Sequence, residues 1–372
     1  MIEVILLFDM DGVLLEPRGY HRALQQTVKL LGAALGFAGA DLSQEDISRF
    51  EALGITSEWD SAAVCRALLL KTRWEQIPAS RGRPDIPVEQ NLQPPNWNAF
   101  LTAVQKQAGA ANPPLKAAGE VLERDLPAEK RTLIRAVLEK AHKPSSLTHR
   151  TFQEFVLGSD TFEKIYGIQP RIGTGSYLKI YDRPGLSAQQ QKALTAWFNP
   201  HRRGSVVTNR PTRPPGLDTG SPEGEMGAAL VGLSGLPLIG YGELTWLGAR
   251  INKPVPALRK PNPTHALAGL LAAAGMETPR ALEIGLQLAE GKHSPPARKL
   301  LHQSRVIIYE DTTAGLISLK SAARILNSLN IQLEIILVGI AADHQKRRAL
   351  AEEGAEVYPD LNDALQAVLG IS

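Results

Sequence analysis

Two pairs of acidic residues directly follow long apolar runs in the sequence. Asp9 and Asp11 follow a run near the amino terminus, and Glu310 and Asp311 follow another near the carboxyl terminus. Such runs of Val, Ile and Leu are typical of strands covered on both faces of a parallel sheet, and ligands bind at the carboxyl ends of these strands. We therefore expect the four carboxylates to share one crevice. Because they repel one another unless a cation lies among them, and because hard oxygen ligands suit Mg²⁺, the sequence predicts a magnesium site.

A third apolar run brings groups that could hold a phosphate. Thr208 and Asn209 end the run that begins at Ser205, and they offer a hydroxyl and a backbone amide at a turn. Lys260 can supply the fixed positive charge that a transferring phosphoryl group requires. The carboxylates, the hydroxyl and the lysine together indicate phosphoryl transfer.

The elements that must position these residues alternate between strand and helix. Strands are expected at residues 2–8, 205–208, 237–241, 305–309, 333–339 and 356–358, and helices at 188–198, 314–329 and 344–353, with a further helix opened by Ser221 as its cap. This alternation predicts an α/β fold, a doubly wound Rossmann-like parallel sheet built from residues 1–14 and 186–372.

Residues 15–185 show a different pattern, in which apolar residues recur at helical spacing. Helices are expected at 20–35, 58–70, 98–107, 129–141 and 151–165. Five prolines between residues 77 and 95 predict a long loop, because proline is excluded from the interior of regular elements. The sequence thus predicts a large helical domain inserted after the first strand, with the two crossings between the domains serving as hinges.

Composition limits the classes of function. Hydrophobic residues make up 43% of the 372 residues, and 41 basic residues against 38 acidic ones give a net charge of +3. This balance argues against nucleic acid as the main partner. The single cysteine, Cys65, favours a reducing, cytoplasmic setting. No stretch matches a signal peptide or a membrane-spanning helix, so we expect no membrane association.

The acidic, hydroxyl and lysine motifs resemble those of one known superfamily. Their sequences are Phe8-Asp-Met-Asp-Gly-Val13, Val206-Val-Thr-Asn209, Lys260-Pro-Asn-Pro263 and Tyr309-Glu-Asp-Thr-Thr-Ala-Gly315. In this order they resemble the haloacid dehalogenase-like superfamily, in particular its phosphatases with a helical cap inserted after the first strand. The resemblance covers about 200 residues of the predicted α/β core in two pieces.

The resemblance implies a role for each motif residue. Asp9 would attack phosphorus to form an aspartyl-phosphate, and Asp11 would protonate the leaving group and then activate water. Thr208, Asn209 and Lys260 would hold the phosphoryl oxygens. The direct Mg²⁺ ligands would be Asp9, Asp311 and the backbone carbonyl of Asp11. Glu310 would act through a water molecule or accept hydrogen bonds from groups around the metal. Because the dehalogenases of the superfamily lack the second acid, Asp11 argues against dehalogenation.

The resemblance also implies that the cap recognises the leaving group. Candidate specificity residues are Glu16, Tyr20, Arg22 and Trp59, and the alternative for Trp59 is packing within the helical domain. Arg210 and Arg213 are expected to be solvated loop side chains, and the alternative for them is a contribution to anion binding. The loop Gly173-Thr-Gly-Ser176 is expected to be a turn, because no lysine and hydroxyl pair follows its glycines as it does in a phosphate loop.

The predicted function is hydrolysis of a phosphomonoester of a small metabolite, with Mg²⁺ as cofactor. Two alternatives stay open: a phosphosugar mutase of the same superfamily, and a non-catalytic binding protein with this fold. A phosphatase acting on nucleic acid is disfavoured by the net charge. The identity of the substrate, the oligomeric state and the role of the proline-rich connection do not follow from the sequence.

Overall fold

The computed structural model describes residues 3–77 and 91–371, and it divides the chain into two compact units. One unit comprises Met1–Pro17 with Asp182–Ser372, and the other comprises Arg18–Tyr181. Residues 15–17 and 182–185, expected to belong to the helical domain, belong to the first unit instead. There β2 (Leu15–Glu16) pairs antiparallel with β3 (Arg183–Pro184).

The first unit is built on a six-stranded parallel sheet. Its strand order is β5 (Leu238–Ile239), β4 (Arg202–Val207), β1 (Val4–Phe8), β6 (Ser304–Glu310), β7 (Leu333–Ile340) and β8 (Glu356–Tyr358). The predicted α/β class and parallel sheet are confirmed. Strands β4 and β6 lie on opposite sides of β1, so the order in which the strands are added reverses at β1. Ligands of such sheets bind at this reversal, at the carboxyl ends of the strands.

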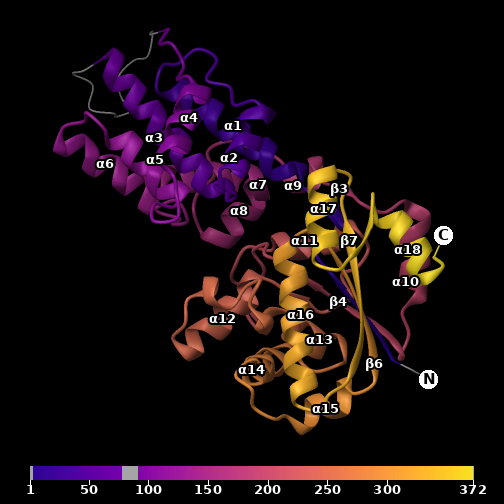
Figure 1. Ribbon diagram of the computed structural model, residues 1–372. Coiled ribbons are helices and arrows are strands. Elements are labelled where there is room, and N and C mark those ends of the chain that lie inside the picture. The colour runs from indigo at the N-terminus through magenta and orange to yellow at the C-terminus, as the bar shows by residue number, and fades with distance from the viewer. Residues whose placement is uncertain (1–2, 78–90, 372) are drawn as a thin grey trace. The chain divides into compact units, whose positions relative to one another are not determined.

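Helices cover both faces of this sheet, because successive residues of its strands point to opposite sides. Ile5 and Leu7 pack with one core cluster, and Leu6 and Phe8 with the other. The first cluster takes apolar residues from α12 (Tyr241–Ile251), α13 (Pro263–Ala273), α14 (Thr278–Ala289), α15 (Pro295–Leu301), α16 (Thr313–Ser328) and α17 (His344–Glu352). The second takes them from α10 (Ala188–Trp197), α11 (Glu223–Leu230) and α18 (Leu361–Leu369) (Figure 1).

Two features of this unit differ from expectation. Residues 241–301 form four α-helices and the short 3₁₀ helix Val255–Ala257, none of which the sequence pattern predicted. In α13 every residue after Pro263 is buried, so this helix lacks the polar face that reveals amphipathic periodicity. Ser221 is not a helix cap: α11 begins after Pro222, and the Ser221 hydroxyl donates to the Glu223 carboxylate instead.

The regular elements described in the second unit are all helices. They are α1 (Arg18–Ala34), α2 (Gln44–Ala52), α3 (Glu58–Gln76), α4 (Trp97–Gln107), α5 (Pro114–Glu123), α6 (Ala128–Glu139), α7 (Leu147–Leu157), α8 (Ser159–Tyr166) and α9 (Tyr177–Tyr181). The helix expected at 151–165 is broken at Gly158, whose φ is +80° and which has no room for a Cβ beside Ser176. Residues 78–90 of the proline-rich connection lie outside the described residues.

The loop that contains Gly173 binds a carboxylate of the protein itself. Backbone N–H groups of Arg171, Ile172 and Gly173 donate to Glu154 at 2.7–3.2 Å, and the Ser159 hydroxyl donates to the same carboxylate at 2.7 Å. Because Glu154 occupies these donors, the glycine-rich loop serves the packing of α7 and α8. Among the described helices, none combines the length and apolar character needed to cross a membrane.

Candidate active site

Strand register brings the expected site residues together in the α/β unit. Phe8 lies opposite Tyr309 in β6 and opposite Val206 in β4, and the Phe8 and Tyr309 rings stack with centroids 5.1 Å apart. The next residues along β1 and β6 are Asp9 and Glu310. The backbone N–H of Asp9 donates to the Tyr309 carbonyl at 2.9 Å, and this hydrogen bond fixes the backbone position of Asp9 beside β6.

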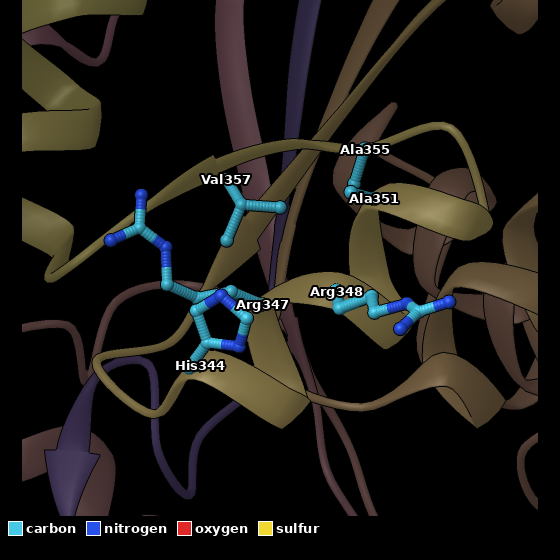
Figure 2. Close-up of a pocket in the computed structure, with 6 residues that line it drawn as sticks. All are labelled: His344, Arg347, Arg348, Ala351, Ala355 and Val357. Atoms are coloured by element: carbon cyan, nitrogen blue, oxygen red, sulfur yellow. The ribbon is translucent and has the colours of Figure 1, made fainter.

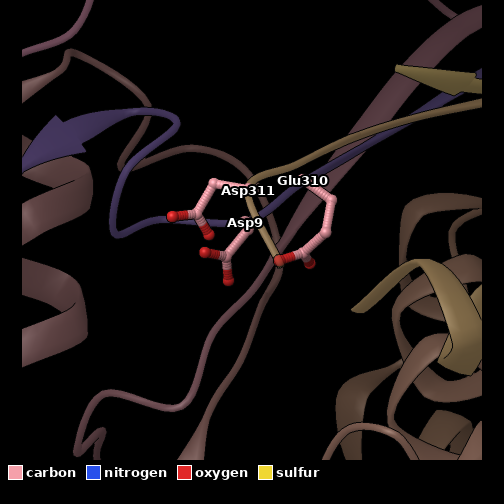
Figure 3. Close-up of side chains that lie close together, drawn as sticks. All are labelled: Asp9, Glu310 and Asp311. Atoms are coloured by element: carbon pink, nitrogen blue, oxygen red, sulfur yellow. The ribbon is translucent and has the colours of Figure 1, made fainter. Parts of the chain in front are cut away.

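Three carboxylates gather at this edge of the sheet. Oxygens of Asp9, Glu310 and Asp311 lie within 4.8 Å of one another (Figure 3). Two glycines make room for them: a Cβ on Gly12, whose φ is +79°, would overlap the Asp311 carboxylate, and a Cβ on Gly315 would overlap that of Glu310. The sequence therefore encodes space for these acids as well as the acids themselves.

Two lysines balance this negative charge. Lys260 Nζ lies 2.6 Å from Asp9 Oδ1 and 2.6 Å from Glu310 Oε2, with only 4% of its side chain exposed. Lys346, from the first turn of α17, pairs with Asp311, and its side chain is 42% exposed. The other oxygen of Glu310 accepts from the hydroxyl of Thr312 at 2.7 Å. Lys260 therefore lies within the carboxylate cluster, and its assignment to a phosphoryl site stays a prediction.

Burial and the neighbouring acids raise the pKa values of Asp9 and Asp311. Burial, followed by the nearby Glu310 carboxylate, raises the pKa of Asp9, and Lys260 opposes this shift. Burial and the Asp9 carboxylate raise the pKa of Asp311 to about 6. Burial by itself lowers the pKa of Lys260, but Asp9 and Glu310 outweigh that effect and raise it. A cation near Asp9 and Asp311 would favour their ionised forms, and hard carboxylate oxygens are suitable ligands for such a cation.

Thr208 is held at the end of β4 by its backbone. Its N–H donates to the Ile239 carbonyl at 3.0 Å, and buried His265 also lies 2.9 Å from that carbonyl through Nε2. Burial and then Lys260 lower the pKa of His265 to about 3, so this side chain is neutral at physiological pH. The Thr208 hydroxyl accepts from the Arg210 N–H at 3.1 Å, while Asn209 is exposed.

The expectation that Arg210 is a solvated loop side chain was wrong. Only 3% of Arg210 is exposed, because its guanidinium is enclosed by two carboxylates. Nε donates to both oxygens of Asp11 at 2.9 and 3.0 Å, and Nη2 donates to Asp11 Oδ1 at 2.6 Å and to Asp182 Oδ2 at 2.9 Å. The Asp11 side chain thus faces Arg210, whereas its expected metal contact is through the backbone carbonyl.

The tentative specificity residues are divided between the two units. Glu16 is exposed in β2 of the α/β unit. Tyr20, Arg22 and Trp59 belong to the helical unit, where Arg22 donates to Gln25 at 3.3 Å. The half-buried Trp59 ring packs against the rings of Tyr20 and Phe152, at centroid distances of 5.6 and 5.1 Å. Trp59 therefore contributes to the core of its own unit, and a role in substrate recognition stays a prediction.

Three residues of the site were missed in the sequence. Lys346 follows β7, so the same strand-end argument that selected Asp9 and Glu310 could have found it. Arg210 lies two residues after Thr208, but sequence position does not show that a loop arginine is buried. Asp182 carries no local signal, since only the fold brings it to Arg210.

Two surface hollows of the α/β unit are lined by basic and apolar residues. One, of about 530 Å³, lies between α17 and β8 and is lined by His344, Arg347, Arg348, Ala351, Ala355 and Val357 (Figure 2). The other, of about 440 Å³, lies along α15 at Pro295, Arg298, Lys299 and His302. The carboxylate cluster is separate from both, and we assign the candidate chemistry to the cluster.

The loop that follows Thr208 is anchored by a buried acid outside the cluster. Glu243 is 6% exposed, accepts from the Thr212 hydroxyl, and accepts from the Gly240 N–H at 2.9 Å. Burial raises the pKa of Glu243 from 4.5 to about 7. The folded state therefore binds a proton more tightly than the unfolded state does, and the free energy of unfolding should fall as the pH rises from 4.5 to about 7.

Replacing Glu243 with Gln should remove this dependence on pH. Between pH 5 and 8 we expect wild type to lose about 2 kcal/mol of unfolding free energy relative to Glu243→Gln, measured by urea denaturation at each pH. The exposed residue Glu139 provides a control, because Glu139→Gln should follow wild type. Parallel pH profiles for wild type and Glu243→Gln would contradict the assignment.

One solved structure is similar to this protein in fold. A solved X-ray structure, described only as a target of the Northeast Structural Genomics Consortium, aligns over 100% of both chains with a TM-score of 0.65 and 17% sequence identity. At this identity the similarity supports the fold alone. No protein-family model and no curated protein matches the chain.

Proposed function

We propose that this protein is a phosphatase of the haloacid dehalogenase-like type, which hydrolyses the phosphomonoester of a small metabolite through an aspartyl-phosphate. The observation that carries the proposal is the placement of Asp9 at the end of the central strand, with Lys260 2.6 Å from one of its oxygens and two further acids beside it. A buried carboxylate beside a fixed cation at the winding reversal of a parallel sheet suits attack on a phosphoryl group.

Each residue would act at a defined atom. Lys260 binds Asp9 Oδ1, so we assign the attack on phosphorus to Oδ2, as the bond from phosphorus to the leaving oxygen breaks. Asp11 gives its proton to that oxygen, then takes one from the water that releases phosphate from Asp9. Thr208 and the Asn209 amide would bind phosphoryl oxygens. Mg²⁺ would neutralise charge on the phosphoryl group. Its direct ligands would be Asp9, Asp311 and the Asp11 carbonyl, and Glu310 would bind it through water or contact its ligands.

The direct test is phosphate release from nitrophenyl phosphate and from a panel of small phosphomonoesters, with Mg²⁺ and with a chelator. We expect Mg²⁺-dependent release that is absent in Asp9→Asn. A protein that binds one of these esters without releasing phosphate would support the non-catalytic alternative. Transfer of the phosphoryl group between positions of a sugar would support the mutase.

Mg²⁺ should stabilise the protein through Asp311. A ligand that binds only the folded state raises stability by mass action, by about 2.7 kcal/mol at a concentration 100 times its Kd. We expect Mg²⁺ to raise the Tm of wild type by several degrees and to leave that of Asp311→Asn unchanged, as measured by calorimetry. Asp218→Asn, at an exposed position, serves as the control and should keep the full shift. A full shift in Asp311→Asn would place the metal elsewhere.

Replacing Asp11 should affect substrates according to their leaving groups. We expect Asp11→Asn to lower turnover of an alkyl phosphate about 10²-fold or more, because an alkoxide needs a proton to leave. Nitrophenolate hardly needs one, so turnover of nitrophenyl phosphate should fall much less. Equal losses on the two esters, measured as kcat under Mg²⁺ saturation, would contradict the acid role of Asp11.

A further inference from the structure

Arg210 joins three parts of the α/β unit at one buried guanidinium. It follows Thr208 in the loop after β4, it holds Asp11 from the loop after β1, and it holds Asp182, the residue before β3. The exposed fractions of the side chains are 1% for Arg210, 1% for Asp182 and 36% for Asp11. Asp182 therefore fixes the guanidinium from the buried side, and Asp11 meets it from the side open to solvent.

The contact with Asp11 constrains orientation as well as charge. Arg210 Nε lies 2.9 and 3.0 Å from the two oxygens of Asp11, and Nη2 lies 2.6 Å from one of them. A planar guanidinium that contacts both oxygens limits the rotation of the carboxylate, which a single ammonium cannot do as well. The loop that carries Asp11 is also fixed by a backbone hydrogen bond, in which the Gly12 N–H donates to the Leu15 carbonyl at 2.8 Å.

The backbone around Asp182 is held just as firmly. The strand that begins after it pairs with β2, and the Gly185 N–H donates to the Leu14 carbonyl at 2.8 Å. A Cβ on Gly185 would lie 2.5 Å from the Val13 carbonyl oxygen, so glycine is required for this approach. Asp182 is thus a rigid anchor for Arg210.

We propose that Arg210 is a positioning residue that aims the Asp11 carboxylate at the leaving group, with Asp182 as its anchor. The inference rests on the proposed phosphatase activity and deepens it, because it adds an arginine and a second aspartate to the acid and base machinery. Arg210 acts through Asp11, so its loss should resemble a weaker version of the loss of Asp11.

The test compares Arg210→Lys with wild type on an alkyl phosphate and on nitrophenyl phosphate. Lysine keeps the positive charge beside Asp182, so the fold should survive, but it cannot contact both oxygens of Asp11 and Asp182 together. We expect the loss in kcat on the alkyl ester to exceed the loss on the nitrophenyl ester by about 10-fold or more. Arg213→Lys makes the same change nearby in the loop and should not alter the ratio of the two rates.

A double-mutant cycle shows whether the effect passes through Asp11. In an Asp11→Asn background, Arg210→Lys should cause little further loss on the alkyl ester, because the group it orients is already absent. Asp182→Asn should also lower kcat more on the alkyl ester than on the nitrophenyl ester. Its loss should be smaller than that of Arg210→Lys, since Arg210 keeps its contacts with Asp11.

The outcomes separate this inference from the proposed function. Equal losses on both esters, or losses that add fully in the cycle, would overturn the positioning role while leaving the phosphatase assignment in place. Should Arg210→Lys fail to fold by circular dichroism, Asp182→Asn makes the same comparison, and equal losses there would overturn the proposal. A wild-type protein that releases no phosphate from any ester would overturn both.

Discussion

Asp9→Asn should abolish turnover and leave the fold intact. The amide has nearly the shape of the carboxylate but cannot attack phosphorus, and removing a catalytic nucleophile costs at least about 10³-fold in kcat. Folding should tolerate the change because Lys260 keeps its 2.6 Å contact with Glu310. Since Asp9 repels Glu310 and Asp311, we expect the Tm of the variant without Mg²⁺ to equal or exceed that of wild type.

The measurement is phosphate release from nitrophenyl phosphate at saturating Mg²⁺, with melting followed by circular dichroism. Asp218→Asn makes the same chemical change on an exposed loop and should retain wild-type turnover. Activity of Asp9→Asn within tenfold of wild type would remove Asp9 as the nucleophile. A large fall in Tm would show instead that the Asp9 carboxylate is needed for folding.

Lys260→Met should produce the largest loss of stability of any single change at the site. Lys260 is buried between Asp9 and Glu310, so the substitution leaves two buried carboxylates without their shared cation. Breaking a buried ion pair by removing one partner costs about 3–5 kcal/mol. Lys346→Met is the matched control: its side chain is 42% exposed and solvent screens its pair with Asp311, so about 1 kcal/mol or less should be lost.

The loss in Lys260→Met should also depend on pH, in a direction that can be derived. Burial and the neighbouring acids raise the pKa of Asp9, and the substitution removes the lysine that opposes this shift, so the folded variant binds more protons than the unfolded chain at mildly acidic pH. Its unfolding free energy should therefore fall as the pH rises from about 5 to 8. Urea denaturation at both values tests this, and a second substitution, Glu310→Gln, should restore part of the stability.

Similar losses for the two lysines would contradict this account, because burial is what distinguishes them. A loss that is constant from pH 5 to 8 would argue that Lys260 acts through its packing rather than through its charge.

The site could be predicted from the sequence only where chemistry and strand ends coincide along the chain. The apolar runs that become β1 and β6 are continuous because both faces of the sheet are buried, and Asp9, Glu310 and Asp311 stand where these runs stop. Parallel strands then place their carboxyl ends at one edge, so local pattern and a general rule of sheet geometry suffice.

One helix that the sequence did not reveal lacks a pattern of its own. Helix α13 is buried on nearly every side, so its apolar residues show no helical periodicity. Helix α14 was missed although its buried residues recur at helical spacing. The break between α7 and α8 depends on Gly158 lying against Ser176, a contact between residues that are far apart along the chain.

The environment of Asp11 was decided by tertiary structure alone. Asp11, Asp182 and Arg210 are distant in sequence, and nothing in the sequence around Asp182 or Arg210 marks either residue as a partner of Asp11. Whether a charged side chain is solvated or buried depends on which other segments fold over it, and burial is stable here because two carboxylates surround the guanidinium. Sequence pattern thus determined which groups stand at the strand ends, whereas the packing of distant segments determined which of them are paired, because pairing requires proximity in space.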